Sequence, residues 1–236
     1  MSVNIYVIGG YSILIYFLFL KIFFGASLGS FINLLFERSS NHESIVLPPS
    51  HCNQCQRTLT IIEKIPILGY LFSKGKCAEC NFKIPMVYLL SEVYLGLISA
   101  GLQIENYEDY LVLIIAALML YMSLSDLKSL CVPSITLYIT FLVSLIITSK
   151  SFATIIIILL CYIGTYLVNN WHKFNFIGNG DIDVLFIFFI IYEIQNVIKI
   201  IFIASFLALI YIKFSEKDKI AFIPFLTTGF LVNYLI

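Results

Sequence analysis

Hydrophobic and polar positions alternate along this chain in whole segments rather than residue by residue. The first apolar stretch covers residues 5–36 and contains a single charged residue, Lys21. About twenty consecutive apolar residues cross the hydrocarbon core of a bilayer as one helix. Seven further apolar stretches follow, and they cover residues 86–102, 110–125, 135–147, 152–168, 184–192, 197–212 and 220–236. The pattern therefore predicts an all-α polytopic membrane protein with about eight transmembrane helices, if the short stretch 184–192 borrows residues from the glycine-rich segment before it.

The composition agrees with a membrane location. Hydrophobic residues make up 60% of the 236 residues and charged residues 12%, and the mean hydropathy is +0.97. A soluble globular domain carries about a quarter charged residues. The formal net charge is zero, so no basic surface indicates nucleic acid as a partner. The first stretch has no basic region before it and no small-residue cleavage site, which favours a retained span over a removable signal peptide.

The lysines and arginines predict the orientation. If the long polar segment 37–85 faces the cytoplasm, alternation through eight spans places Lys150 and Lys199 on the opposite side. The other basic residues outside the first span then share the cytoplasmic side, namely Arg38, Arg57, Lys64, Lys74, Lys76, Lys83, Lys128, Lys173, Lys213, Lys217 and Lys219. Cytoplasmic loops of membrane proteins carry such an excess. We therefore expect a multi-pass membrane protein with segment 37–85 in the cytoplasm.

Segment 37–85 holds four of the six cysteines. Cys52-x-x-Cys55 and Cys77-x-x-Cys80 are separated by 21 residues. Two such knuckles supply the four thiolates that a structural zinc ion prefers. Two disulfides or four unconnected thiols are the alternatives, although a reducing cytoplasm disfavours disulfides. We predict three parts: a first transmembrane segment (1–36), a zinc-ribbon-like cytoplasmic subdomain (37–85) and a membrane core (86–236).

Two aspartates lie at the predicted cytoplasmic face, one at the end of an apolar stretch and the other at the start of a later one. Asp126 lies in SLSDLKSL and Asp181 in IGNGDIDV. Ionisable residues at membrane depth mark functional sites by default, and two neighbouring carboxylates share a proton and perform general acid–base chemistry. Gly178 and Gly180 permit a tight turn or a close substrate approach. The alternatives are a helix N-cap for Asp181 and a solvated position beside Lys128 for Asp126.

Two other carboxylates need separate interpretations. Asp183 lies two residues after Asp181, roughly 200° further around a helix, so both cannot readily point into one site. We interpret Asp183 as a turn or surface residue. Glu92 lies inside the stretch 86–102, where it is a buried hydrogen-bonding or pairing group with an open role. Cys131 and Cys161 lie in or beside apolar stretches and are interpreted as packing residues.

Several motifs in order resemble those of the bacterial type IV prepilin peptidases. GASLGSFINLLFER is similar to the first-span motif of this family, and the paired knuckles enclose IPILGYLFSKGKC. IPMVYLLSE places Glu92 on a family acid, SDLKSLCVP resembles the first catalytic-aspartate segment, GNGD matches Gly-x-Gly-Asp, and IAFIPFLTTG resembles the closing motif.

The resemblance implies a function and its residues. It implies Asp126 and Asp181 as the catalytic pair of an aspartic endopeptidase. Its substrates would be prepilins or pseudopilins, whose short basic leader is cleaved at the cytoplasmic face. Many members also methylate the new N-terminus with S-adenosylmethionine. The chain departs from the family at Asp183, where lysine is usual, and at Tyr70, where tryptophan is common.

Three other functions fit part of the pattern. A related Gly-x-Gly-Asp intramembrane protease would act on signal peptides or preflagellins, but such relatives generally lack the cysteine knuckles. A transporter would scatter polar residues near the bilayer midplane, whereas Asp126 and Asp181 gather at one face. A zinc-bearing membrane scaffold would need neither aspartate for its role.

Overall fold

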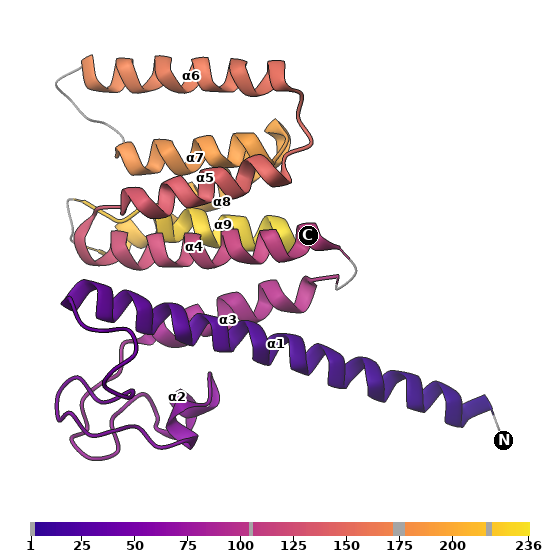
Figure 1. The fold of residues 1–236 in the computed structure, drawn as a ribbon, viewed down its shortest axis with the longest axis vertical. Helices are drawn as coiled ribbons and strands as arrows, with labels where there is room; N and C mark the ends of the chain where they lie inside the picture. The colour runs from indigo at the N-terminus through magenta and orange to yellow at the C-terminus, as the bar shows by residue number, and fades with distance from the viewer. Residues whose placement is uncertain (1–2, 104–105, 172–177, 216–218) are drawn as a thin grey trace. The chain divides into compact units, whose positions relative to one another are not determined.

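The computed structural model describes residues 3–103, 106–171, 178–215 and 219–236. In these ranges the regular secondary structure is helical (Figure 1). The long helices are α1 (Val3–Asn41), α3 (Met86–Gly101), α4 (Tyr107–Ser129), α5 (Ser134–Ile147), α6 (Phe152–Trp171), α7 (Asn179–Ile191), α8 (Ile194–Phe214) and α9 (Ile223–Leu235). The loop between α1 and α3 contains a short 3₁₀ helix, Ile62–Lys64, and the single-turn helix α2, Leu68–Phe72.

The predicted all-α class is confirmed, and a helix forms at each of the eight apolar stretches. Four described helices are long and apolar enough to cross a bilayer by themselves. They cover Leu14–Asn41, Tyr107–Ser129, Phe152–Asn169 and Ile194–Phe214. The helices α3, α5 and α9 are shorter, with 10–17 residues. The predicted count of eight spans is therefore not confirmed, because length alone does not carry the shorter helices across the hydrocarbon.

The chain forms two compact units, residues 1–105 and residues 106–236. The first unit holds α1, the cysteine loop and α3, and the second holds α4 to α9. The predicted division into residues 1–36, 37–85 and 86–236 stays a prediction.

In the first unit, two glycines bring α1 and α3 into close contact. A Cβ atom added to Gly25 would lie 2.2 Å from the carbonyl oxygen of Leu95, and one added to Gly29 would lie 2.7 Å from that of Ser91. No side chain fits there, so the two backbones touch. Small residues four positions apart are the usual means of such close helix packing in membranes.

A buried polar pair extends the same contact by one helical turn. The Asn33 amide donates to Ser91 Oγ at 2.6 Å, and that hydroxyl also lies 2.8 Å from Asn33 Oδ1. Asn33 is 6% exposed and Ser91 2%, so both groups need internal partners. The motif GASLGSFIN at residues 25–33 thus serves helix packing in this fold.

The second unit stacks its helices around an apolar core. In order of contact, α6 packs on α7, α7 on α5, α5 on α4, and α4 on α9, with α8 against α9 (Figure 1). The rings of Phe188 and Phe230 stack at 5.8 Å between centroids, where α7 meets α9. Met119 and Met122 of α4 are completely buried. This core fixes the ends of α4 and α7, which carry the two predicted aspartates.

Lysine side chains from other segments cap the C-terminal ends of two short helices, α3 and α7. Lys21 of α1 donates to the carbonyl of Leu102 at the end of α3. Lys150 donates to the carbonyls of Phe189 and of Tyr192, the latter at 2.6 Å, at the end of α7. Unpaired carbonyls at a helix end are costly away from water. The positive charges also favour the negative end of the helix dipole.

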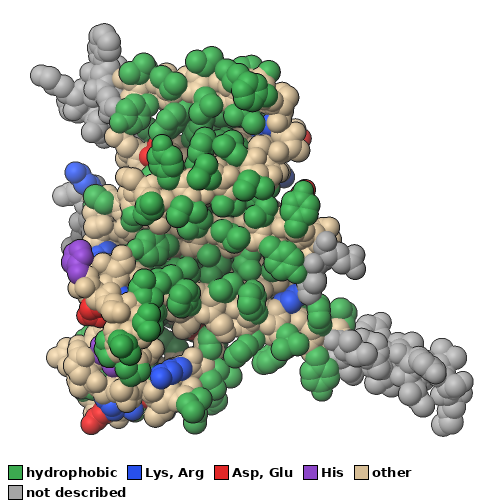
Figure 2. All heavy atoms as spheres, in the orientation of Figure 1, with side chains coloured by type: hydrophobic (Ala, Val, Ile, Leu, Met, Phe, Trp, Pro, Cys, Tyr) green, Lys and Arg blue, Asp and Glu red, His purple; other side chains and the backbone are tan. Residues whose placement is uncertain are grey.

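Apolar side chains cover the surface of the helices. Hydrophobic side chains dominate the face drawn in Figure 2. On α8, Phe202 is 70% exposed and Leu209 66%. None of the described residues in the span on α6 is buried. Such surfaces are stable against lipid tails rather than water, as expected of a membrane protein.

Candidate active site and metal site

Asp126 lies on the last turns of α4 and faces inward. Its side chain is 6% exposed, and its Oδ2 accepts a hydrogen bond of 3.1 Å from the N–H of Ile223. Ile223 begins α9, whose first N–H groups have no partners within the helix. Leu130 ends α4 in the left-handed conformation, with φ 53°. Because Asp126 is buried and accepts a hydrogen bond from α9, the interpretation of Asp126 as a solvated residue beside Lys128 is wrong.

Asp181 lies in the first turn of α7. The N-cap of that helix is Gly178, and no side-chain hydrogen bond caps it. The N-cap interpretation of Asp181 is therefore wrong. A Cβ atom added to Gly178 would lie 3.0 Å from Asp181 Oδ2. The absence of a side chain at Gly178 thus leaves room for the carboxylate to fold back over the turn.

Close packing joins the segments that carry the two aspartates within the second unit. A Cβ atom added to Gly180 would lie 2.7 Å from Cγ2 of Val132, in the link between α4 and α5. The turn before α7 thus packs against the segment that follows Asp126. Two such carboxylates share one proton readily, because like charges at short range cannot both ionise easily.

Asp183 has a different neighbour. The hydroxyl group of Tyr162, on α6, donates to Asp183 Oδ1 at 2.5 Å. The Tyr162 ring also packs on Phe186, with centroids 4.5 Å apart. Asp183 is thus turned toward α6. Nothing in the sequence pointed to Tyr162, because a tyrosine in an apolar helix has many uses.

The four loop cysteines converge. Their sulfur atoms all lie within 4.8 Å of one another. Cys52 Sγ lies 3.7 Å from Cys80 Sγ, and Cys55 Sγ lies 3.9 Å from Cys77 Sγ. A disulfide would need about 2.05 Å, and all four thiols are free. The cluster could hold a metal ion, and it is the one such group of His, Cys, Asp or Glu side chains in the described ranges.

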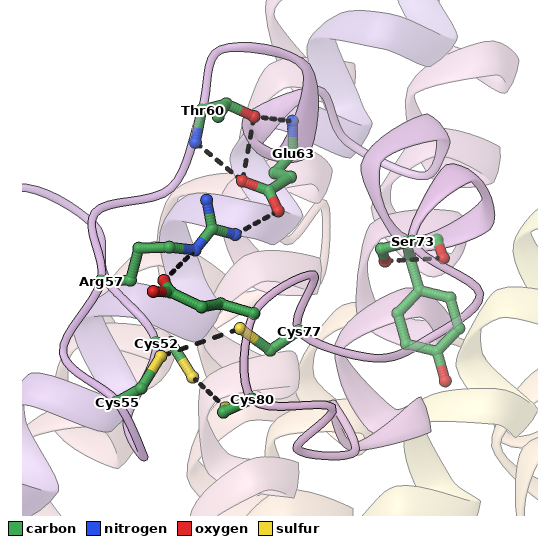
Figure 3. Close-up of polar contacts among 10 residues, drawn as sticks. Cys52, Cys55, Arg57, Thr60, Glu63, Ser73, Cys77 and Cys80 are labelled. Carbon is green, nitrogen blue, oxygen red and sulfur yellow. Dashed lines mark hydrogen bonds and ion pairs between the residues drawn. The ribbon is translucent and has the colours of Figure 1, made fainter.

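The two knuckles share one backbone design. The N–H of Gln56 donates to the carbonyl of Cys52 at 2.8 Å, and the N–H of Asn81 donates to that of Cys77 at 3.1 Å. Gln56 and Asn81 both have positive φ, 59° and 57°. Each knuckle therefore turns through a left-handed residue directly after its second cysteine. Equivalent turns present the four sulfur atoms from two sides (Figure 3).

Backbone N–H groups favour the thiolate form of one cysteine. Those of Cys80 and Glu79 lower the pKa of the Cys77 thiol to about 6. The usual value for cysteine is about 8.5. The pKa values of the Cys55 and Cys80 thiols are raised instead, so Cys77 is the cysteine of the cluster whose thiolate, the form that binds a metal, is favoured.

An arginine links the two knuckles through carboxylates. Arg57 NH2 lies 2.5 Å from Glu63 Oε1, and its Nε lies 3.3 Å from Glu79 Oε2 (Figure 3). Glu63 also accepts from the Thr60 N–H at 2.8 Å and from the Thr60 hydroxyl at 2.9 Å. The Thr60 N–H first, and Arg57 as well, lower the pKa of Glu63. The spacing Thr-x-x-Glu is a capping box, a signal present in the sequence that the sequence analysis did not use.

Glu92 ties the loop to α3. Its Oε2 accepts a hydrogen bond of 2.6 Å from the N–H of Ile67. Ile67 has a φ of 62°, which is unusual for a β-branched residue. Glu92 therefore pairs with the loop rather than with an aspartate. Tyr70, the other departure noted in the sequence, contacts Gly75, where an added Cβ atom would lie 2.7 Å from the tyrosine hydroxyl oxygen.

Two family models match the chain, one on each compact unit. Residues 23–105 match the model described as Bacterial Peptidase A24 N-terminal domain. Residues 113–213 match the model described as Type IV leader peptidase family. The cysteine cluster falls within the first match, and Asp126 and Asp181 fall within the second.

Curated proteins with similar sequences carry consistent names. The chain is 34% identical over 114 residues to the Prepilin leader peptidase/N-methyltransferase of Bacillus subtilis, covering 47% of this chain and 46% of that protein. It is 24% identical over 180 residues to the protein of that name from Vibrio cholerae, covering 66% and 70%. The chain spans less than half the length of the first three curated relatives that it matches. No solved structure matches the chain.

Proposed function

The chain belongs to the type IV leader peptidase family, and we propose from this membership that it is a membrane-embedded aspartic endopeptidase. Its substrates are type IV prepilins or pseudopilins, and it removes their short basic leader at the cytoplasmic face of the inner membrane. One observation carries the proposal: Gly180, next to Asp181, packs against Val132 in the segment that follows Asp126.

The two carboxylates divide the chemistry between them. In the singly protonated pair, the ionised carboxylate takes a proton from a water molecule, which attacks the scissile carbonyl carbon. The protonated partner donates a hydrogen bond to the carbonyl oxygen as negative charge develops there. The N–H of Ile223 donates to one oxygen of Asp126 and so fixes the carboxyl group against the start of α9. The burial of Asp126 limits competing solvation.

The test replaces each aspartate in full-length protein that is co-expressed with a prepilin. Asp126→Asn and Asp181→Asn should each abolish leader cleavage, measured as the mass of the pilin N-terminus. Asp183→Asn is the matched control, because asparagine still accepts a hydrogen bond from Tyr162; it should cleave close to the wild-type rate. Wild-type cleavage by either of the first two variants, with all three inserted equally, would show that the pair is wrongly assigned.

We propose zinc as the structural metal of the cysteine cluster. Four thiolates at about 2.3 Å from a central zinc ion lie about 3.8 Å apart. The measured sulfur separations of 3.7 and 3.9 Å fit this arrangement. All four tetrahedral positions are filled by Cys52, Cys55, Cys77 and Cys80, so the ion would hold the loop together.

Metal analysis tests the assignment. Cys55→Ser and Cys80→Ser should each lower the zinc content of the purified protein well below one per chain. Cys131→Ser is the control, since Cys131 is exposed and outside the cluster. Unchanged zinc in all the cluster variants would overturn the assignment.

N-methylation is a second activity that relatives carry in their names. We propose that this chain also methylates the new N-terminus, with S-adenosylmethionine supplying the methyl group when bound. The mass measurement described above reports both reactions, because a methylated pilin is heavier by one methyl group.

A further inference from the structure

A cavity lies within the first unit, and residues of that unit alone line it. It has a volume of about 220 Å³ and is lined by the C-terminal part of α1, the cysteine loop and the start of α3. Four carboxylates line it: Glu37 from α1, Glu43 and Glu63 from the cysteine loop, and Glu92 from α3. Glu63 is paired with Arg57 and Glu43 is exposed, which leaves Glu37 and Glu92. The peptidase chemistry proposed above uses neither of these two.

Neutral donors hold the Glu37 carboxylate. Its Oε1 accepts a hydrogen bond of 2.9 Å from Asn53 Nδ2 and another from the hydroxyl group of Tyr88. Asn53 lies between the cysteines of the first knuckle, and Tyr88 lies on α3. Glu37 is thus fixed in place by the loop and by α3, and no positive charge is involved.

Neutral donors also hold the Glu92 carboxylate. It accepts from the N–H of Ile67 at 2.6 Å and from the side chain of Ser30. Glu92 is half-buried. A half-buried carboxylate without a positive partner is costly, unless a ligand supplies the charge.

The basic residues that line the cavity do not neutralise these two groups. Among the described residues, no Lys or Arg nitrogen is paired with Glu37 or Glu92 within 4.0 Å. The guanidinium group of Arg38 is directed to the backbone carbonyls of Ser44 and Pro48 instead. Lys76 lines the cavity but forms no such pair. Among the described residues, Glu37 and Glu92 therefore line the cavity without a basic partner.

Aromatic rings line the same cavity. Tyr70, Phe82 and Tyr88 contribute to its wall. The face of an aromatic ring attracts cations, and quaternary or sulfonium-like centres favour such surroundings. Unpaired carboxylates and aromatic rings together select a cationic ligand over a neutral or anionic one.

We propose that this cavity binds a small cationic ligand, a sulfonium or a primary ammonium compound, through Glu37 and Glu92. The inference deepens the proposed methyl transfer and rests on it for the sulfonium source, S-adenosylmethionine, which carries both kinds of positive centre. The amine source is the free amino group of a peptide N-terminus. Both sources present the same charge to the same two carboxylates.

Binding to the full-length protein in nanodiscs tests the proposal without any catalytic readout. S-adenosylmethionine should bind the wild type at least about tenfold more tightly than S-adenosylhomocysteine, which lacks the sulfonium charge. This comparison needs no variant. Glu37→Gln and Glu92→Gln keep an oxygen that accepts the hydrogen bonds described above, so the loop should fold. Each should weaken S-adenosylmethionine binding about tenfold or more.

The control is Glu108→Gln, the same change at an exposed position of the second unit, which should bind like the wild type. If n-butylamine displaces S-adenosylmethionine when both are present at the same concentration, the cavity recognises the ammonium group rather than the sulfonium centre. Equal binding of the two adenosyl compounds together with competition by butylamine would likewise assign the cavity to the ammonium group, which both compounds carry. No binding of either compound or of butylamine, or wild-type binding by both glutamine variants, would overturn the proposal.

Leader cleavage by the wild type is measured separately. If the protein binds these ligands but does not cleave the leader, only the peptidase proposal is contradicted. If it cleaves the leader but binds none of the ligands, only the cavity proposal is contradicted.

Discussion

At the scale of single residues, Glu63 shows how one carboxylate stabilises the cysteine loop. It accepts two hydrogen bonds from Thr60 and pairs with Arg57, which also reaches Glu79 of the second knuckle. These contacts lower the pKa of Glu63, the backbone N–H of Thr60 most of all. A depressed pKa in the folded loop means that ionised Glu63 stabilises the fold above its unfolded pKa of about 4.3. This stabilisation is lost as the pH falls through the lower, folded value.

We expect the substitution Glu63→Gln to weaken the loop at neutral pH. Protease protection of segment 42–84 in the purified chain should be lower for the variant at pH 7. The gap should close as the pH falls below about 4.3, because the wild type then loses the same charge. A gap that stays constant over this range would mean that the charge of Glu63 does not stabilise the loop.

Gly180 tests the packing that joins the segments carrying the two aspartates. In Gly180→Ala, the new methyl group meets Val132 at 2.7 Å, so the turn must shift and carry Asp181 with it. We expect leader cleavage to fall about tenfold or more, because a displacement near 1 Å is costly to catalysis. Gly164→Ala, on α6, is the control, since nothing lies within 4 Å of its added Cβ atom. Equal cleavage rates for the two variants would rule out this role for the contact.

At the scale of elements, the helices are joined by backbone contact and by side chains that reach helix ends. Gly25 and Gly29 let α1 meet α3 without side chains between them. Lys21 and Lys150 each close the C-terminal end of a short helix. The predicted orientation leaves three lysines outside the cytoplasmic group: Lys21, Lys150 and Lys199. Two of them, Lys21 and Lys150, cap helix ends in the structure.

Gly25→Ala should destabilise the first unit. The added methyl group would lie 2.2 Å from a backbone oxygen of α3, and overpacking of this kind costs about 1–3 kcal/mol. Thermal unfolding in detergent measures the loss. Gly164→Ala gains helix propensity of roughly 1 kcal/mol without a clash, so it should be neutral or stabilising. A Gly25→Ala protein as stable as the wild type would mean that α1 and α3 separate easily.

Lys150→Met should destabilise the end of α7 by about 1–3 kcal/mol, because the carbonyls of Phe189 and Tyr192 lose a charged donor. Lys199→Met is the control, since Lys199 is exposed and its nearest recorded partner, Asn196 Oδ1, lies at 3.5 Å. Hydrogen exchange of residues 186–192 reports the change locally. Equal exchange in both variants would show that the lysine cap contributes nothing.

At the scale of the whole molecule, the cysteine cluster and the two aspartates belong to different compact units. The cysteines and their contacts belong to residues 1–105, and Asp126 and Asp181 belong to residues 106–236. The two family models divide the chain in the same way. Each part therefore has its own means of holding its functional groups in place.

Metal removal should act on one part alone. We expect a strong chelator to raise hydrogen exchange throughout segment 50–84, because the loop buries little apolar surface and depends on its ligands. Exchange in α4, α7 and α9 should stay at the untreated level. Equal increases in all four regions would show that the metal stabilises the whole chain.

Much of this organisation could be predicted from the sequence, for physical reasons. The apolar stretches place the helices because lipid requires internal backbone hydrogen bonds. The spacing of Cys52, Cys55, Cys77 and Cys80 predicts their convergence because four thiolates share one preferred geometry. The partner of Asp183, the role of Lys150 and the bridge made by Arg57 could not be predicted. They depend on which helix faces meet, and periodicity does not specify that.

Lys21 of α1, which donates to the carbonyl of Leu102 at the end of α3, has a consequence for the surrounding lipid. At 1.5 Å per residue the 16 residues of α3 span about 24 Å, less than the hydrocarbon core of about 30 Å, whereas α1 is long enough to cross it. Lys21 contacts the end of the shorter helix α3. Its positive charge therefore lies within the apolar part of α1, at a depth that the hydrocarbon core still covers. Such hydrophobic mismatch is relieved when the bilayer thins locally and water reaches the ammonium group. We expect the protein to prefer thin membranes and to lose stability as acyl chains lengthen.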